Sequence, residues 1–358
     1  MGAGDTGSYP NISSSRSTRP TSPPAASCAT RRMRGDRARF TCRSICSLSS
    51  DSTSLSRSII SSQNRREEMG MPGFAPIVGA PFGVESDFDL SRPIDAVEGY
   101  AIRRAFAEHK LLVFRNQNLS QDEQARALGT LGDVLPAGRE VGEVSVDGTL
   151  GSSALAFHSD LIFTEEPIKV LSLHAIDVAE GETVTRFANG IAAARHLSPA
   201  LRDRLSQTPA LALMSIVQSR RAIPVVIPDI LPRAERPALI AHPATGEPIL
   251  YVTEMQTVRL GGMYEADSDE LLHLLFGLLY APANIYEHRW RRGDLVIWDN
   301  LALQHGRPDL AGVARRRLQR ACVADHDFAE LCPDFNSSDP RVKALGRGED
   351  YTADTATY

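Results

Sequence analysis

Short stretches in which apolar and polar side chains alternate constrain the fold of this chain more than any other feature. They are bounded by glycine, proline and asparagine and lie at residues 168–178, 248–252 and 294–299. A period of two residues is typical of strands that bury one face. Short strands with helices between them predict a mainly β protein with flanking helices (α+β) and a sandwich or barrel core.

Helix signals lie before and between these strands. Residues 94–110 carry apolar side chains on one helical face and precede a strand-like stretch at residues 111–115. Ser120 and Glu123 have the spacing of a capping box, and further helices are expected to begin at residues 198–199 and 267–270. No glycine-rich phosphate-binding motif occurs, so a nucleotide-binding βαβ fold has no support.

Composition divides the chain into three parts. Residues 1–68 are rich in Ser, Arg, Thr and Pro, which predicts a disordered leader. This leader is interpreted either as a transit peptide or as sequence upstream of a true start at Met69 or Met71. We expect one folded domain over residues 69–335, in which residues 222–237 form a mobile part of a lid, and a polar tail over residues 336–358.

Charge and cysteine content limit the partners and the compartment. Residues 1–66 contain eleven arginines, no lysine and three aspartates, whereas the whole chain has a net charge of −5, so the body is acidic. An acidic body is a poor match for nucleic acid or an anionic membrane. Since Cys322 and Cys332 follow no zinc or CxxC spacing, a reducing, cytoplasmic location is expected. The oligomeric state stays open, and a homo-oligomer is one alternative.

One group of residues has the composition of a metal site. His158 and Asp160 are separated by one residue, and on a strand such side chains project from the same face. His305 follows the strand predicted at residues 294–299 and is the candidate third ligand. Two histidines and one carboxylate form a facial triad that suits Fe(II) and leaves coordination positions open. A zinc hydrolase could use the same ligands.

Two arginines supply a second line of evidence. In the stretch 315–320, Arg316 and Arg320 share a strand face with Leu318, which indicates that this face is directed to the core. Buried guanidinium groups are costly unless anions pair with them, and the sequence offers no obvious matching carboxylates. A small organic anion is therefore the expected partner.

From about residue 82 to residue 327 the chain resembles the TauD/TfdA family, the taurine and 2,4-dichlorophenoxyacetate dioxygenases that depend on iron(II) and 2-oxoglutarate. The motifs that carry this resemblance, in order, are residues 111–115 (LLVFR) with 117–120 (QNLS), His158-x-Asp160, residues 181–183 (GET), 190–194 (GIAAA) with 197–199 (LSP), 242–246 (HPATG) with Tyr251, and 298–300 (WDN) before His305. The resemblance implies a double-stranded β-helix, or jelly roll.

The resemblance also implies roles for particular residues. The iron ligands would be His158, Asp160 and His305. Arg316 and Thr183 would bind the C5 carboxylate of 2-oxoglutarate, with Thr185 on the same strand face as a second candidate. Arg320 would face the anionic end of the primary substrate, and Trp298 would lie near the metal.

The implied function is a dioxygenase that uses Fe(II), 2-oxoglutarate and O₂ to hydroxylate a small organic anion, a sulfonate, sulfate ester, aryloxyalkanoate or other carboxylate. Collapse of the product could then release a leaving group. Residues 133–156 contain no histidine, unlike sulfonate-using relatives, which argues against taurine. Two alternatives are a metal-binding jelly-roll protein without turnover and a zinc hydrolase using the same His₂Asp site.

The remaining histidines receive structural interpretations. His109, His196 and His273 are assigned to helices, and His288 is expected to be exposed. His174 alternates with apolar residues on a predicted strand, so it is expected in the core or in a pocket.

Overall fold

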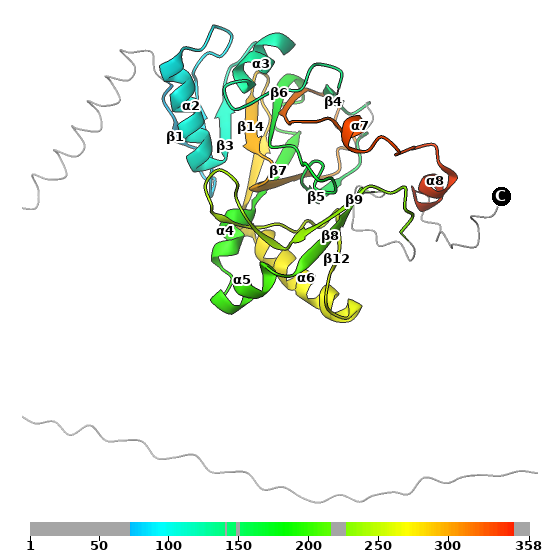
Figure 1. Ribbon diagram of the computed structural model, residues 1–358. Coiled ribbons are helices and arrows are strands. Elements are labelled where there is room, and N and C mark those ends of the chain that lie inside the picture. Colours follow the sequence, from blue (N-terminus) through cyan, green and yellow to red (C-terminus); the bar gives the residue numbers. More distant parts are fainter. Residues whose placement is uncertain (1–71, 140–141, 148–150, 216–226, 347–358) are drawn as a thin grey trace, which may run out of the picture. The chain divides into compact units, whose positions relative to one another are not determined.

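A computed structural model describes residues 72–139, 142–147, 151–215 and 227–346 of the chain (Figure 1). The predicted leader, residues 1–68, lies outside the described residues, and so do residues 222–226 of the stretch expected to be a mobile part of a lid. Residues 336–358, predicted to be a polar tail, are described only as far as residue 346. The domain boundaries stay predictions.

The larger of two facing sheets has seven strands. Their order is β1 (Ala75–Pro76), β2 (Val84–Ser86), β3 (Leu111–Phe114), β14 (Leu295–Asp299), β6 (Val170–Val178), β16 (Arg316–Val323) and β4 (Glu143–Ser145). Only the β2–β3 pair is parallel among these described strands. Four of these strands, β3, β6, β14 and β16, were predicted from alternation or apolar runs.

The smaller facing sheet has four antiparallel strands. Their order is β13 (Ile285–Arg289), β7 (Val184–Asn189), β15 (Leu303–Arg307) and β5 (Leu155–His158). In this sheet His305 of β15 lies directly opposite His158 of β5 on one side and Phe187 of β7 on the other. Directly opposed residues of neighbouring strands project to the same face. Register alone therefore brings the two histidines together.

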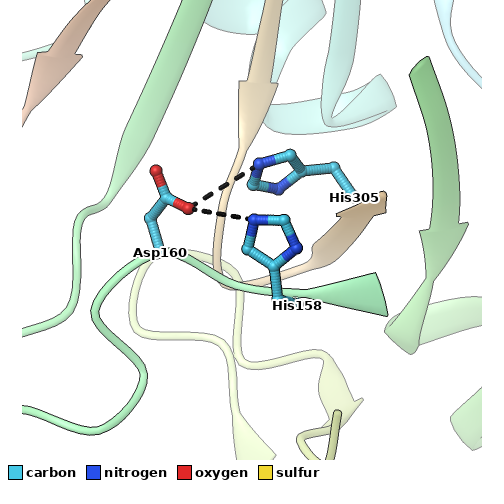
Figure 2. A group of neighbouring side chains, drawn as sticks. All are labelled: His158, Asp160 and His305. Atoms are coloured by element: carbon cyan, nitrogen blue, oxygen red, sulfur yellow. Dashed lines mark ion pairs between the residues drawn. The ribbon is translucent and has the colours of Figure 1, made fainter. Parts of the chain in front are cut away.

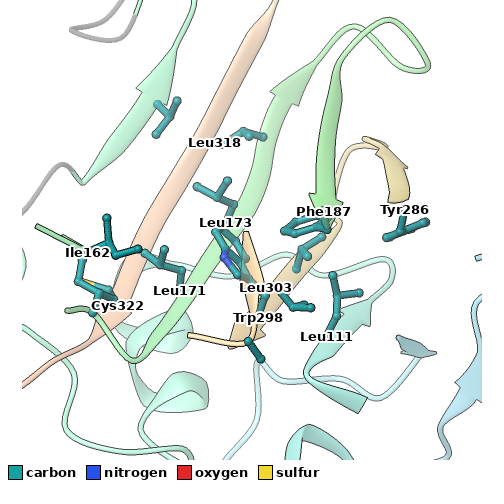
Figure 3. Packing of buried hydrophobic residues seen from close by; sticks show 14 of the residues in the cluster. Leu111, Ile162, Leu171, Leu173, Phe187, Tyr286, Trp298, Leu303, Leu318 and Cys322 are labelled. Carbon is teal, nitrogen blue, oxygen red and sulfur yellow. The ribbon is translucent and has the colours of Figure 1, made fainter. Parts of the chain in front are cut away.

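The main hydrophobic core lies between these two sheets (Figure 3). Leu111, Leu171, Trp298 and Leu318 come from the seven-stranded sheet, whereas Phe187, Tyr286 and Leu303 come from the four-stranded sheet. The rings of Phe187 and Trp298 meet edge to face at 5.3 Å, an arrangement favoured by aromatic pairs. The alternating residues of each strand thus fill the space between the sheets, as the sequence predicted.

Two helices cover the outer face of the larger sheet. In α2 (Ala96–His109), Ile102 and Ala105 pack with strand residues that face outward, and Leu128 of α3 (Gln121–Leu128) joins the same cluster. The predicted capping box at Ser120 and Glu123 is confirmed, since each side chain accepts a hydrogen bond from the other residue's backbone N–H.

A third layer packs beside the smaller sheet and reaches the open end of the core. It contains α4 (Gly190–Arg195), α5 (Pro199–Leu205), α6 (Glu265–Leu279), a three-stranded sheet in the order β12 (Thr257–Leu260), β8 (Pro209–Leu213) and β9 (Arg233–Pro237), and the hairpin of β10 (Leu239–Ala241) with β11 (Pro248–Leu250). In Figure 1 the helices α4, α5 and α6 lie with β8 and β12, on the side away from α3.

Two predictions about this layer need correction. Residues 222–237 were expected to be a mobile part of a lid, but Arg233–Pro237 form β9 and pair with β8. The helix expected to begin at residues 267–270 begins at Glu265. The short helices η1 (Pro282–Asn284), α7 (Phe328–Leu331) and α8 (Pro340–Gly346) complete the described elements, and none of the helices in these ranges could cross a membrane. The mainly β fold with flanking helices is confirmed.

Candidate active site

A cavity of about 250 Å³ opens between the two facing sheets. The smaller sheet contributes charged and polar side chains to it, the larger sheet contributes two arginines and an indole, and the β8 and β12 region closes it with two methionines. The lining includes His158, Asp160, Thr185, Met214, Met255, Gln256, Trp298, His305, Arg307, Arg316 and Arg320.

His158 and Asp160 reach the cavity by different means. β5 ends at His158, and Asp160 lies in the turn that follows, where Leu161 adopts a φ of 58°. The expectation that both side chains project from one strand is therefore wrong, although they do converge. His158 Nδ1 donates a hydrogen bond to the carbonyl of Ala156 at 2.9 Å, which leaves the lone pair on Nε2. That Nε2 lies 3.4 Å from Asp160 Oδ1.

His305 completes the group from β15. Its Nε2 lies 3.7 Å from the same Asp160 oxygen, and its ring centroid lies 4.1 Å from that of His158 (Figure 2). Trp298 packs edge-on against the imidazole at 5.0 Å. One ligand atom from each of His158, Asp160 and His305 lies within 4.8 Å of the other two, so these three side chains could hold a metal ion.

The protonation states suit a divalent cation. Burial raises the pKa of Asp160, but the adjacent imidazole of His158 and the charge of Arg320 outweigh it, so the pKa lies well below its usual range. Burial, with the neighbouring imidazole of His158, lowers the pKa of His305 to about 3. At neutral pH His305 therefore offers a neutral imidazole and Asp160 an ionised carboxylate, the donor types that Fe(II) takes in facial triads.

Arg316 lies in the same cavity with unsatisfied donors. Its side chain is almost fully buried, and its Nε and Nη1 have no hydrogen-bond partner among the described residues. Burial, together with the positive charge of Arg307, lowers its pKa to about 9. A buried guanidinium without a partner is costly, whereas a carboxylate would satisfy it with paired hydrogen bonds. The cavity thus fits the far carboxylate of 2-oxoglutarate.

The two candidate threonines differ in what they touch. Thr185 lines the cavity, and its hydroxyl oxygen accepts a hydrogen bond from Trp290 Nε1 at 2.9 Å, which leaves its own proton free to donate. Thr183 is fully buried, is absent from the cavity lining, and its Oγ1 has no partner among the described residues.

Arg320 has a carboxylate partner that the sequence did not reveal. Its Nη2 donates to Asp160 Oδ2 at 2.7 Å, so the expectation that no matching carboxylate exists is corrected. Asp160 therefore presents Oδ1 to the two imidazoles and Oδ2 to the guanidinium. This pairing fixes the orientation of the carboxylate.

Sequence reasoning missed three side chains at the site. Arg307 lies two residues beyond His305 on the same strand face, lines the cavity and donates to the carbonyl of Gly151 at 2.5 Å. The two-residue period could have revealed it. Gln256 and Asn300 bind the backbone around Asp160, a role that a sequence pattern does not signal.

His288 and His174 lie elsewhere. His288 was expected to be exposed, but it is fully buried between the sheets, where Tyr286 donates to its Nδ1 and its Nε2 lies 3.1 Å from Asp294. His174 is buried, as expected for a core residue, but it does not line this cavity, and its Nε2 donates to the carbonyl of Gln117 at 3.3 Å.

Comparison with known proteins agrees with this geometry. The profile of the family described as "Taurine catabolism dioxygenase TauD, TfdA family" matches residues 74–322. An alpha-ketoglutarate-dependent sulfate ester dioxygenase of Pseudomonas putida is 28% identical over 66% of this chain and 83% of its own length. The alpha-ketoglutarate-dependent 2,4-dichlorophenoxyacetate dioxygenase of Cupriavidus pinatubonensis is 29% identical over 68% of this chain and 94% of its own.

A solved structure supports the fold. The crystal structure of a taurine dioxygenase from Burkholderia xenovorans superposes with a TM-score of 0.60 over 71% of this chain and 90% of its own, at 23% identity. This similarity confirms the jelly-roll fold. Because the family profile covers well over half of the sequence, the chain belongs to the TauD/TfdA family of 2-oxoglutarate-dependent dioxygenases, whose members use Fe(II), 2-oxoglutarate and O₂.

Proposed function

We propose that this enzyme hydroxylates a small organic anion with an apolar body, a sulfate ester or an aryloxyalkanoate. His158, Asp160 and His305 would hold Fe(II), and Arg316 with Thr185 would bind the C5 carboxylate of 2-oxoglutarate. The single observation that carries the proposal is the presence, in one cavity, of this ligand group and of Arg316 with two unpaired donors. A metal site alone would not require a buried anion receptor.

The bound metal would supply O₂ activation coupled to oxidation of 2-oxoglutarate to succinate and CO₂, which is the chemistry of the family. The protein's own residues do the rest. Arg316 orients the cosubstrate by a bidentate contact, which sets its chelating end toward the ligand group. Arg320, which already holds Asp160, offers its positive charge to the anionic end of the substrate.

The walls of the cavity support a substrate with an apolar body. Phe163, Leu155, Met214 and Met255 line it, and thioether side chains adapt to irregular apolar shapes. The relatives in Pseudomonas putida and Cupriavidus pinatubonensis act on a sulfate ester and on 2,4-dichlorophenoxyacetate, as their names state. In both substrate types hydroxylation beside the ester or ether oxygen gives a product that collapses to a carbonyl and releases the leaving group.

Anaerobic binding of iron and 2-oxoglutarate, followed by turnover, tests this function. Fe(II) and 2-oxoglutarate added to the protein should give the weak visible band of a chelated keto acid, and Arg316→Leu should lose it at the same cosubstrate concentration. After O₂ is admitted, alkyl sulfates or aryloxyalkanoates should raise succinate release above the substrate-free rate. Binding without stimulated succinate release would favour a protein without turnover. Product formed under strict exclusion of O₂ would favour the zinc hydrolase.

A matched pair of variants separates the two threonines. Thr185→Val removes a hydroxyl that lines the cavity, whereas Thr183→Val removes one that does not. Loss of one hydrogen bond to a charged group costs about 1.5–3 kcal/mol, so Thr185→Val should weaken 2-oxoglutarate binding by roughly 10- to 150-fold. Titration of the visible band measures this change. An unchanged affinity in Thr185→Val with a weakened one in Thr183→Val would return the role to Thr183, as the family resemblance implied.

The expected cytoplasmic location, the absence of a nucleic-acid partner and the oligomeric state stay predictions. The cysteine pattern supports the first and the acidic body the second, and size measurement of the purified protein would decide the third.

A further inference from the structure

The chain segment that carries Asp160 leaves its sheet just before that residue. β5 ends at His158, so Ser159 and Asp160 lack the strand partners that would otherwise satisfy their backbone. Ser159 is buried, and Asp160 lines the cavity. Buried backbone N–H and C=O groups without partners are costly, so the segment needs other donors and acceptors. Two amide side chains supply them.

Asn300 binds the backbone of Asp160 on both sides. Its Oδ1 accepts from Asp160 N–H at 3.0 Å, and its Nδ2 donates to the Asp160 carbonyl at 3.0 Å and to the Ile168 carbonyl at 2.8 Å. Since the Ile168 carbonyl can only accept, the orientation of this amide is determined. Asn300 is fully buried.

Gln256 binds the backbone of Ser159 in the same way. Its Oε1 accepts from Ser159 N–H at 3.2 Å, and its Nε2 donates to the Ser159 carbonyl at 3.1 Å. Since the Ser159 N–H can only donate and its carbonyl can only accept, the orientation of this amide is determined too, and the Thr253 hydroxyl also donates to Gln256 Oε1 at 3.1 Å. The Ser159 carbonyl also accepts from the Ile162 N–H at 3.3 Å.

The two amides attach the segment to different parts of the fold. Asn300 lies between β14 and β15, and β15 carries His305. Its turn is held by Asp299, whose Oδ1 accepts from two backbone N–H groups and whose Oδ2 accepts from His242 at 2.7 Å. Gln256 lies in the cavity wall before β12. One amide therefore fixes Asp160 relative to the second histidine, and the other fixes it relative to the substrate-facing wall.

We propose that Gln256 and Asn300 form a paired amide clamp, and that both are positioning residues for the metal site. Neither is among the proposed metal ligands, and both amides bind the backbone of the segment that carries one. They act by holding the backbone of Ser159 and Asp160 so that the Asp160 carboxylate meets the imidazoles of His158 and His305. An amide is the neutral side chain suited to this role, because it has both a donor and an acceptor and can bind the N–H and the carbonyl of one residue at once. This inference rests on the proposed metal ligands.

Titration of the metal-free, full-length protein with Mn(II) alone tests the clamp without turnover. Gln256→Met keeps the side-chain volume and removes both hydrogen bonds to Ser159, and Asn300→Ala removes the second amide. Loss of a residue that orients a metal ligand typically costs about 10- to 100-fold in metal affinity, and each variant should weaken Mn(II) binding by that factor. The signal of free Mn(II) in electron paramagnetic resonance gives the dissociation constant.

Gln117→Met is the matched control. Gln117 is also buried and its amide also binds backbone groups, accepting from Leu90 N–H and donating to the carbonyls of Phe88 and Arg115, but it does not line the cavity. This control should lower the midpoint of thermal unfolding while the Mn(II) dissociation constant stays at the wild-type value. If the role of Gln256 and Asn300 were purely structural, their variants would also lower the midpoint of thermal unfolding and leave the Mn(II) dissociation constant at the wild-type value.

The outcomes are distinct. The clamp is supported if Gln256→Met, folded by circular dichroism, binds Mn(II) at least about 10-fold more weakly than Gln117→Met. It is overturned if folded Gln256→Met binds as tightly as wild type, and Gln256→Met decides the matter even if Asn300→Ala fails to fold. Wild-type protein that binds Mn(II) but never releases succinate would contradict the proposed function and leave the clamp intact.

Discussion

Asp160→Asn should lose metal binding almost completely while keeping its fold. The substitution preserves the shape of the side chain but removes the negative charge that Oδ1 presents to the two imidazoles at 3.4 and 3.7 Å. Loss of a direct ligand should cost more than the about 100-fold typical of an outer partner. Mn(II) titration measures the affinity, and the band of bound 2-oxoglutarate should disappear with it.

An exposed aspartate serves as the control for this change. Asp177 pairs with Arg315 at 3.3 Å near the surface, so Asp177→Asn should leave both the Mn(II) affinity and the visible band at wild-type values. Wild-type Mn(II) affinity in folded Asp160→Asn would contradict the assignment of Asp160 as a ligand. Succinate release by Asp160→Asn at the wild-type rate would contradict the proposed site as a whole.

Asp294→Ala should cause the largest loss of stability. The carboxylate is almost fully buried and is surrounded by donors, with Arg115 Nη1 and the Arg291 N–H at 2.9 Å and His288 Nε2 at 3.1 Å. Its removal leaves the guanidinium of Arg115 with only Glu85 as a charged partner. Breaking a buried pair by removing one member costs about 3–5 kcal/mol. Urea unfolding of the metal-free protein at neutral pH measures the free energy of unfolding.

The matched control for Asp294 is an exposed acid in β13, the strand that precedes it in the sequence. Glu287 pairs with Arg186 at 2.8 Å on the solvent-facing side of β13, so Glu287→Ala should change the free energy of unfolding by about 1 kcal/mol or less. Equal losses in the two variants would mean that the buried network contributes no more than a surface ion pair. Asp294 does not line the cavity, so the Mn(II) affinity of folded Asp294→Ala should equal that of wild type.

Local patterns predicted the elements whose signals are themselves local. The period of two located β6 and β14, and the spacing of Ser120 and Glu123 located the start of α3. The start of α6 was predicted too late, because Ser268 was counted among the residues that begin the helix. In the structure Ser268 lies inside α6, and its hydroxyl accepts from the Leu260 N–H at 2.8 Å, which ties the helix to β12. Ser268 thus resembles a helix cap in the sequence, but its hydroxyl makes a tertiary hydrogen bond instead.

The site was predictable where residue types alone carry the chemistry. Two histidines, one aspartate and a face of alternating arginines are unusual enough to be noticed, and the structure brings all of them to one cavity. The ion pair of Arg320 with Asp160 joins residues far apart in the sequence, so no spacing rule could have revealed it. His288 was misjudged although alternation placed it beside Tyr286 and Trp290, both buried, on the inward face of its strand.

The distribution of the metal ligands along the chain also bears on the order in which the protein folds. His158 is the last residue of β5 and Asp160 follows that strand, whereas His305 belongs to β15, which lies far later in the chain. Pairing of these two strands closes a very long loop, and such contacts form late because the entropy of closure must be offset first. A metal held by these residues would therefore bind the completed domain and stabilise it by mass action, and it would not guide the early steps of folding. Metal uptake during refolding would thus report the late pairing of β5 with β15 in the smaller sheet.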